Sequence, residues 1–195
     1  MDASTSILRV VHVVTAVLMA WPYYALVVVH QRSVLGPPLG DRADVFMEQT
    51  IKNRVIPCFV LQGTAMASGV WLIFRVRGGF DDLIDNSRLG AKFLLLVFIA
   101  GLLAYVHVRL QPKLDSLFIE HQSDPGRSAV GERIGQLRLY RKRIASVCLF
   151  CVLTMVMLGV QTWAPFDTWL TWVMVAAIAA FTYRTYRSGS PYGWA

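Results

Sequence analysis

The segment IASVCLFCVLTMVMLGVQTWA, residues 144–164, contains no charged residue and decides the fold. About 20 residues at 1.5 Å each cross the ~30 Å hydrocarbon core of a bilayer, and this segment is apolar on every helical face. It is therefore predicted to be a transmembrane helix. Comparable blocks, each bounded by charged residues, occupy residues 7–29, 55–74, 90–110 and 166–183.

Composition supports the same conclusion for the whole chain of 195 residues, of which 55 % are hydrophobic and 16 % charged, with a mean hydropathy of +0.49. A water-soluble domain of this composition would expose large apolar patches. We predict one all-α domain over residues 1–195, an integral membrane bundle of four core helices plus a fifth. The first block is too long for a signal-peptide core. A cytoplasmic connection, residues 111–142, joins the third and fourth spans, with helical spacing in 113–120 and 132–139.

Orientation follows from the basic residues. With five spans, 14 of the 19 Lys and Arg residues fall on the side that holds residues 30–54, 109–143 and the C-terminal tail. Positive loops stay in the cytoplasm, so the N-terminus is predicted outside and the C-terminus inside a bacterial cytoplasmic membrane. The net charge of +7 indicates anionic lipid as partner, not nucleic acid. The basic run Arg138–Arg143 is interpreted as a flank of the fourth span, with phosphate binding as the weaker alternative.

Three cysteines fall inside predicted spans, where a thiol packs as a small apolar group. A metal or redox pair formed by Cys148 and Cys151 is the alternative. Pro22 is expected to kink the first helix, with Trp21, Tyr23 and Tyr24 lining a pocket beside it.

Histidines at the ends of two spans are the candidate site. His12 and His30 are 18 residues apart, which is five helical turns, so both lie on one face of the first helix. Lys92 opens the third span and His107 closes it. Depth therefore pairs His12 with Lys92 outside and His30 with His107 inside, and intramembrane ionisable groups are candidate functional residues. Interfacial anchoring of His30 and His107, and a snorkelling Lys92, are the alternatives.

We predict that a cofactor is bound by His12, Lys92, His30 and His107, with the three histidines as metal ligands. Imidazole binds haem iron and copper, and a helical bundle can enclose a haem. The absence of a Cys-x-x-Cys-His motif excludes a covalently attached c-type haem. The sequence shows no nucleophile with a general base and no phosphate loop, so catalytic residues are not identified.

The pattern Leu8-Arg-Val-Val-His12, with His30 closing the helix, Phe46-Met-Glu48, Ile56-Pro57 and Ala91-Lys92, resembles the HemJ type of protoporphyrinogen oxidase. This superfamily includes the membrane domain of copper-resistance protein D. The resemblance covers residues 8–160. It implies a b-type haem bundle in which His12 and Lys92 match the characteristic His and Lys, and His30 and His107 match further histidines.

The resulting hypothesis is a haem b membrane protein of electron transfer or of porphyrin and haem metabolism. If the chain is an enzyme, the resemblance implies an oxidoreductase. The first alternative is a cofactor-free accessory subunit of a respiratory or photosynthetic membrane complex. A weaker alternative is copper handling through the same histidines. Beyond the bilayer, the expected partners are other membrane subunits or an electron-transfer partner.

Overall fold

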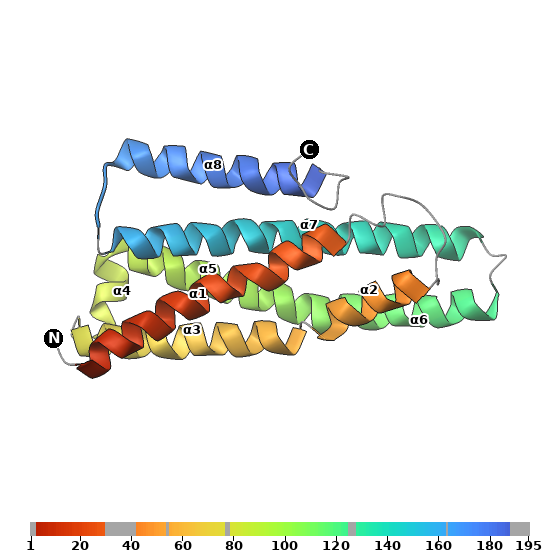
Figure 1. Cartoon of the computed structure of the whole chain (residues 1–195), viewed down its shortest axis with the longest axis horizontal. Coiled ribbons are helices and arrows are strands. Elements are labelled where there is room, and N and C mark those ends of the chain that lie inside the picture. The colour runs from red at the N-terminus through yellow and green to blue at the C-terminus, as the bar shows by residue number, and fades with distance from the viewer. Residues whose placement is uncertain are drawn as a thin grey trace.

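The computed structural model describes residues 3–29, 42–53, 55–76, 79–124, 128–162 and 164–187. Every regular element in these ranges is helical, which confirms the predicted all-α class for this part of the chain (Figure 1). The elements are α1 (Ala3–Val29), α2 (Arg42–Asn53), α3 (Val55–Val76), α4 (Asp81–Asp85), α5 (Ser87–Tyr105), the π-helical η2 (Val106–Leu110), α6 (Gln111–Ser123), α7 (Ser128–Gln161) and α8 (Thr168–Arg187).

Four helical stretches, those that contain α1, α3, α5 and α7, are long and apolar enough to cross a membrane. The block predicted as a fifth span, residues 166–183, corresponds to α8, which is not among these four. α8 runs antiparallel to α7 along its C-terminal half and packs on α7 and α1 (Figure 1). The aromatic rings of Tyr24 and Phe181 stack with their centroids 6.3 Å apart and join α8 to α1.

The central helix is α7, which packs against α1, α5, α6 and α8, while α1 also packs along α3. Side chains from three helices form the core: Met19 and Tyr23 of α1, Ile99 of α5, and Leu149 and Val152 of α7. All five are at most 2 % exposed, so the bundle is closely packed at this level.

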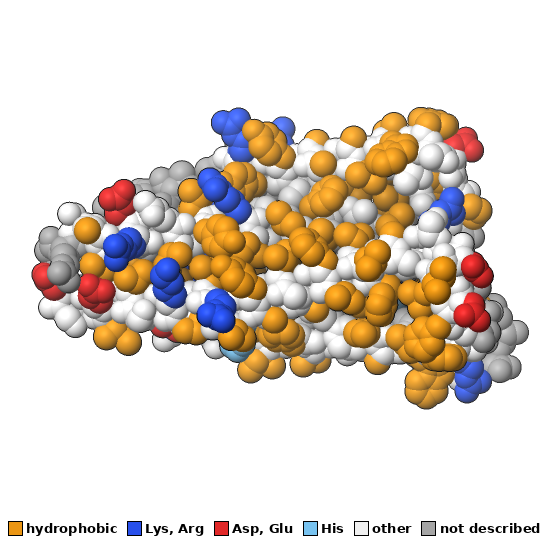
Figure 2. Space-filling view, turned by 180° about the vertical axis from the view of Figure 1, so that it is seen from behind, with side chains coloured by type: hydrophobic (Ala, Val, Ile, Leu, Met, Phe, Trp, Pro, Cys, Tyr) orange, Lys and Arg blue, Asp and Glu red, His pale blue; other side chains and the backbone are white. Residues whose placement is uncertain are grey.

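The outer surface of the bundle is apolar. Trp21, Ile56, Leu94 and Trp172 are each more than 60 % exposed. Figure 2 shows a broad band of hydrophobic side chains across the wide part of the molecule, with Lys, Arg, Asp and Glu gathered at its two ends. Such a surface is unfavourable in water and favourable in hydrocarbon, which suggests a membrane protein.

Beyond this band the helices continue as a polar extension. α7 has 34 residues, about 51 Å of helix, which exceeds the ~30 Å hydrocarbon core by several turns. Its first half packs on α6 through Leu114, Leu117, Val130 and Ile134. The predicted connection 111–142 is therefore a helical hairpin over most of its length, and the helical spacing recognised in 113–120 and 132–139 is confirmed.

Candidate functional site

His12 lies in the third turn of α1, where α1 packs along α3, and its imidazole is partly buried. A Cβ atom built on Gly69 of α3 would lie 3.1 Å from Cε1 of this ring. Because glycine has no side chain at this point, the imidazole fits against the α3 backbone. The small-residue spacing of α3 thus makes room for a polar ring between the helices.

The hydrogen-bond geometry of His12 favours a proton on Nδ1. Nδ1 lies 2.9 Å from Oγ of Ser68, and the Ser68 hydroxyl donates its hydrogen to the carbonyl oxygen of Thr64 at 2.6 Å. With its hydrogen directed along α3, Ser68 Oγ acts as acceptor for Nδ1–H of His12. The neutral ring then keeps the lone pair on Nε2, and it is this nitrogen that can bind a metal or accept a hydrogen bond.

Lys92 enters the same region from the second turn of α5. Its ammonium group interacts electrostatically with His12, and a Cβ atom built on Gly159 of α7 would lie 3.3 Å from Nζ. Among the described residues Lys92 makes no hydrogen bond or ion pair, although its side chain is partly buried. Four helices therefore contribute to one polar site, hereafter the histidine–lysine site: His12, Ser68 with Gly69, Lys92 and Gly159.

His107 is not part of this site. It lies in η2, fifteen residues or about 22 Å of helix beyond Lys92, and its side chain is exposed. Its ring meets the ring of Phe59 edge to face, with centroids 6.2 Å apart. His30, its predicted partner, lies outside the described residues. The structure thus brings together His12 and Lys92 of the predicted set and places His107 on the surface.

A second polar cluster was not recognised in the sequence. Glu48 of α2 forms a two-pronged ion pair with Arg141 of α7, with oxygen to nitrogen distances of 2.6 and 2.8 Å. Gln111 of α6 accepts from Arg141 at 2.7 Å and donates to Glu48 at 3.3 Å. Arg138 adds a contact of 3.5 Å to Glu48. These four residues, hereafter the glutamate–arginine cluster, are all buried and join three helices of the polar extension.

The ionised form of the Glu48 carboxyl group is strongly favoured, although the residue is buried. Glu48 lies outside the apolar segment 55–74. Burial alone would raise the pKa of this carboxyl group, but the hydrogen bonds and charges of Arg141 and Arg138 lower the pKa to about 2. Three basic residues of the run 138–143 therefore face the protein interior, because Arg138, Arg141 and Lys142 are at most 7 % exposed. Their spacing on one helical face was the signal that could have indicated a buried acidic partner.

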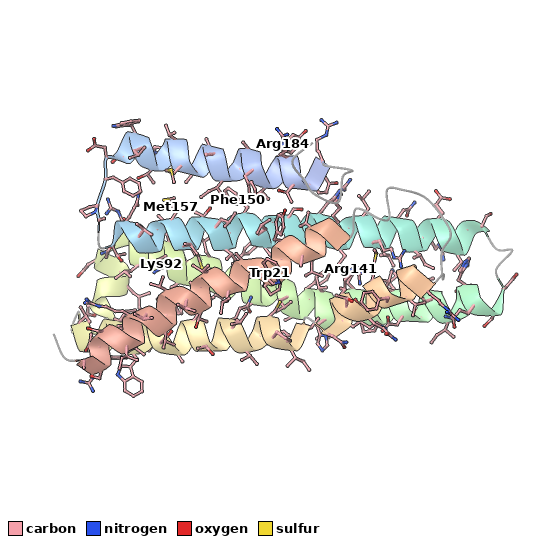
Figure 3. The ribbon with its side chains drawn as sticks, viewed as in Figure 1. Trp21, Lys92, Arg141, Phe150, Met157 and Arg184 are labelled. Carbon is pink, nitrogen blue, oxygen red and sulfur yellow. The ribbon has the colours of Figure 1, made fainter. Side chains whose placement is uncertain are left out.

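Cys58, Cys148 and Cys151 are buried in the bundle and are not joined by disulfides. They surround Tyr23, whose hydroxyl oxygen accepts a hydrogen bond of 2.8 Å from Nε2 of Gln62. Helix α1 continues through Pro22. The expected aromatic pocket around it is not formed as predicted, since the Trp21 side chain is 61 % exposed and Tyr23 is 2 % exposed. Figure 3 marks Trp21 on α1 between Lys92 and Arg141.

No family model, curated protein or solved structure matches the chain. Its chemistry must therefore be inferred from the two clusters. Within the described ranges no three His, Cys, Asp or Glu residues lie close enough to hold a metal ion. The histidine–lysine site, as defined above, contains one imidazole, that of His12.

The donor chemistry of the site nevertheless fits a haem, for which His12 would supply one iron ligand. Metal-binding histidines usually donate their second ring N–H to a fixed acceptor, as His12 does to Ser68. A cationic Lys92 beside the ring suits a carboxylate, and haem b carries two of them. The residues present would hold a haem through the imidazole of His12, and a haem carboxylate would compensate the positive charge of Lys92.

Proposed function

We propose that the chain is a five-span protein of a bacterial cytoplasmic membrane, with its N-terminus outside and its C-terminus in the cytoplasm. The apolar band of Figure 2 supports insertion. α8 has 20 residues, about 30 Å of helix, and lies beside the apolar half of α7, which supports its assignment as the fifth span. The excess of basic residues on one side supports the orientation.

Within this bundle we propose a b-type haem site at His12 and Lys92, serving electron transfer or porphyrin and haem metabolism. The observation that carries the proposal is the imidazole of His12, which donates through Nδ1 to Ser68 and leaves Nε2 available. When bound, haem supplies one-electron chemistry at its iron. The resemblance to the HemJ type, in which His12 and Lys92 match the characteristic pair, supports the same assignment.

The protein side of this function is positioning and charge. Ser68 holds the imidazole in one tautomer and one orientation. Gly69 and Gly159 leave room for the His12 ring and the Lys92 ammonium group. Lys92 binds a carboxylate of the haem or of a porphyrin substrate, because a partly buried cation needs a counter-charge in a low-dielectric medium.

A cofactor-free accessory subunit is the second candidate. Two hollows open on the outer surface along α3, and the core at Met19, Ile99 and Val152 is filled by side chains. Such a bundle could function by packing against other membrane subunits. Copper handling through the histidines is the third candidate and has the least support, because a single imidazole is a poor copper site.

The decisive experiment is a visible absorption spectrum of the protein purified from haem-supplemented cells, followed by a pyridine haemochrome assay. We expect a Soret band in the wild type and its loss in His12→Ala. The haem affinity of this variant should fall by more than the ~10- to 100-fold that is typical of removing an outer-shell partner. His107→Ala is the matched control and should retain the haem, because His107 lies on the surface. A colourless wild type, or equal haem in His12→Ala and wild type, would refute the proposal.

A further inference from the structure

A hollow runs along the outer face of α3 where α3 packs against α1. Its wider part has a volume of about 520 Å³, and a second part of about 340 Å³ continues toward the end of α3. The two parts share Ala67 and Trp71, so they form one groove. The wider part is lined by Leu8 and Val11 of α1 and by Val60, Gly63, Thr64, Ala67, Ser68 and Trp71 of α3.

The floor of the groove is apolar, although it contains two hydroxyl groups. Thr64 donates its hydroxyl hydrogen to the carbonyl oxygen of Val60 at 2.9 Å, and Ser68 donates to that of Thr64 at 2.6 Å. Both hydrogens are therefore directed to the backbone of α3 and not into the groove. A Cβ atom built on Gly63 would meet no atom within 4 Å, so the groove is open at this residue. Such a surface suits a hydrocarbon chain and not a polar ligand.

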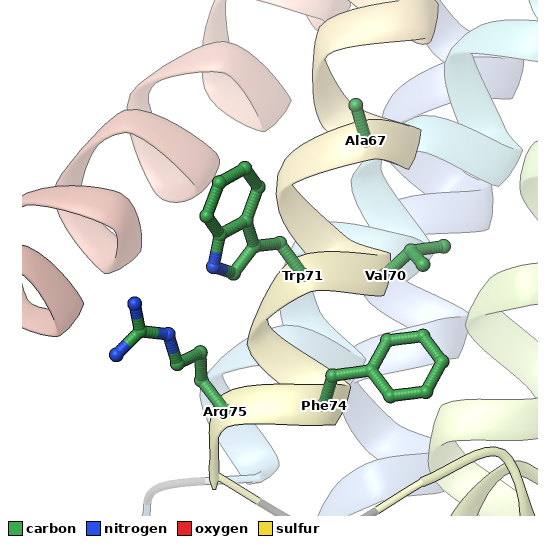
Figure 4. A pocket seen from close by; sticks show the side chains of 5 residues that line it. All are labelled: Ala67, Val70, Trp71, Phe74 and Arg75. Atoms are coloured by element: carbon green, nitrogen blue, oxygen red, sulfur yellow. The ribbon is translucent and has the colours of Figure 1, made fainter.

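One end of the groove is cationic. Arg75, in the last turn of α3, lines its narrower part together with Trp71, Val70 and Phe74. Figure 4 shows Trp71 and Arg75 on the side of α3 that faces α1, with Val70 and Phe74 directed elsewhere. No carboxylate of the described residues is paired with Arg75. The guanidinium group is therefore available to an anion, with an interfacial tryptophan next to it.

We propose that this groove binds one acyl chain of an anionic phospholipid, with the phosphate of its headgroup at Arg75. The twelve residues from Val60 to Trp71 extend about 16 Å, close to the ~15 Å that one leaflet contributes to the hydrocarbon core. Length, apolar lining and terminal charge thus match one lipid chain and its headgroup. The inference depends on the bilayer placement proposed above and is independent of the haem.

Native mass spectrometry of the detergent-purified full chain tests this inference, with dipalmitoyl phosphatidylglycerol and dipalmitoyl phosphatidylcholine as probes. We expect the wild type to retain one phosphatidylglycerol in preference to phosphatidylcholine. Gly63→Leu should weaken this binding about tenfold, because the new side chain displaces roughly two methylene groups of the lipid from the groove. Gly101→Leu on α5 is the matched control, since a Cβ atom there also meets nothing within 4 Å.

Arg75→Gln tests the contribution of the headgroup separately from that of the acyl chain. This substitution should make phosphatidylglycerol and phosphatidylcholine bind equally. Arg109→Gln, at the opposite end of the bundle, should leave the preference unchanged. Equal effects of Gly63→Leu and Gly101→Leu, or a phosphatidylglycerol preference that survives Arg75→Gln, would overturn the inference. Thermal melting by circular dichroism checks that each variant is folded. Recovery of the wild type from carbonate-washed membranes tests bilayer placement separately, so that failure of lipid binding is not confused with failure of insertion.

Discussion

The glutamate–arginine cluster and the histidine–lysine site are two groups of polar side chains in the same helical protein, but they differ in how their charged side chains are paired. Arg141 is paired with both oxygens of Glu48 and with Gln111. The ammonium group of Lys92, by contrast, makes no hydrogen bond or ion pair among the described residues, and it lies near the imidazole of His12. A cluster whose carboxylate is paired with guanidinium groups joins helices, whereas a cation that has no anionic partner can receive a ligand.

The position of each cluster agrees with this difference. Glu48, Gln111 and Arg141 come from α2, α6 and α7, the helices of the polar extension, where they replace contacts that a small apolar core cannot supply. His12 and Lys92 lie among α1, α3, α5 and α7, where apolar packing already holds the helices together. A charge in that region contributes little to folding and is retained for another reason, which we attribute to ligand binding.

The largest expected effect on stability comes from breaking the glutamate–arginine cluster. Glu48→Ala leaves Arg141 buried without its carboxylate, and such changes destabilise by about 3–5 kcal/mol. Thermal unfolding in detergent should show this loss. Lys52→Ala is the control, because the Lys52–Asp115 pair has the same kind of contact, 2.7 Å, but is about 40 % exposed and contributes ~1 kcal/mol or less. If both variants melt alike, the cluster does not stabilise α2.

Acid should weaken the same cluster over a defined range. The pKa of Glu48 is about 2 in the folded chain against an ordinary value of 4.5. A carboxylate whose pKa is lowered by folding contributes fully above its unfolded pKa and loses the contribution as pH falls toward the folded value. The stability difference between wild type and Glu48→Gln should therefore be constant from pH 7 to about 5 and should shrink between pH 4.5 and 2. A difference that already disappears above pH 5 would contradict a buried, ionised Glu48.

Sequence reasoning identified the features that depend on hydropathy and helix length. The apolar blocks became α1, α3, α5 and α7, and counting turns placed His12 and Lys92 at one depth, where the structure also brings them together. Both predictions use only the rise of a helix and its apolar length. Such quantities are local and can be obtained from a single chain segment.

The features that sequence reasoning missed depend on how helices are rotated about their axes. Glu48 and Arg141 are separated by 93 residues, and no local pattern indicates that their helix faces meet. His107 was expected inside, but it lies in the π-helical η2, where the wider turn changes the direction of the following side chains. A periodicity of 3.6 residues contains no signal of such a turn. The hydropathy of α8 likewise does not assign it as a span, since α8 is not among the four helical stretches that are long and apolar enough to cross a membrane.

The smallest expected effect concerns Ser68 of the histidine–lysine site. Ser68→Ala removes the acceptor of the His12 Nδ1–H group, and loss of such an outer-shell partner typically lowers metal affinity by 10- to 100-fold. Haem titration of the apoprotein, followed at the Soret band, should show this decrease with little change in melting temperature. Ser146→Ala is closely matched, because Ser146 is also buried and donates to the carbonyl oxygen four residues earlier, that of Lys142 at 2.9 Å, but contacts no imidazole. Equal haem affinity in the two variants would show that Ser68 does not fix the ring of His12, and Nε2 would then no longer be assigned as the free nitrogen. A decrease in haem affinity confined to Ser68→Ala would instead mean that the histidine–lysine site is organised for a ligand. If the Ser68 hydroxyl only packed between helices, the two substitutions would change haem affinity alike.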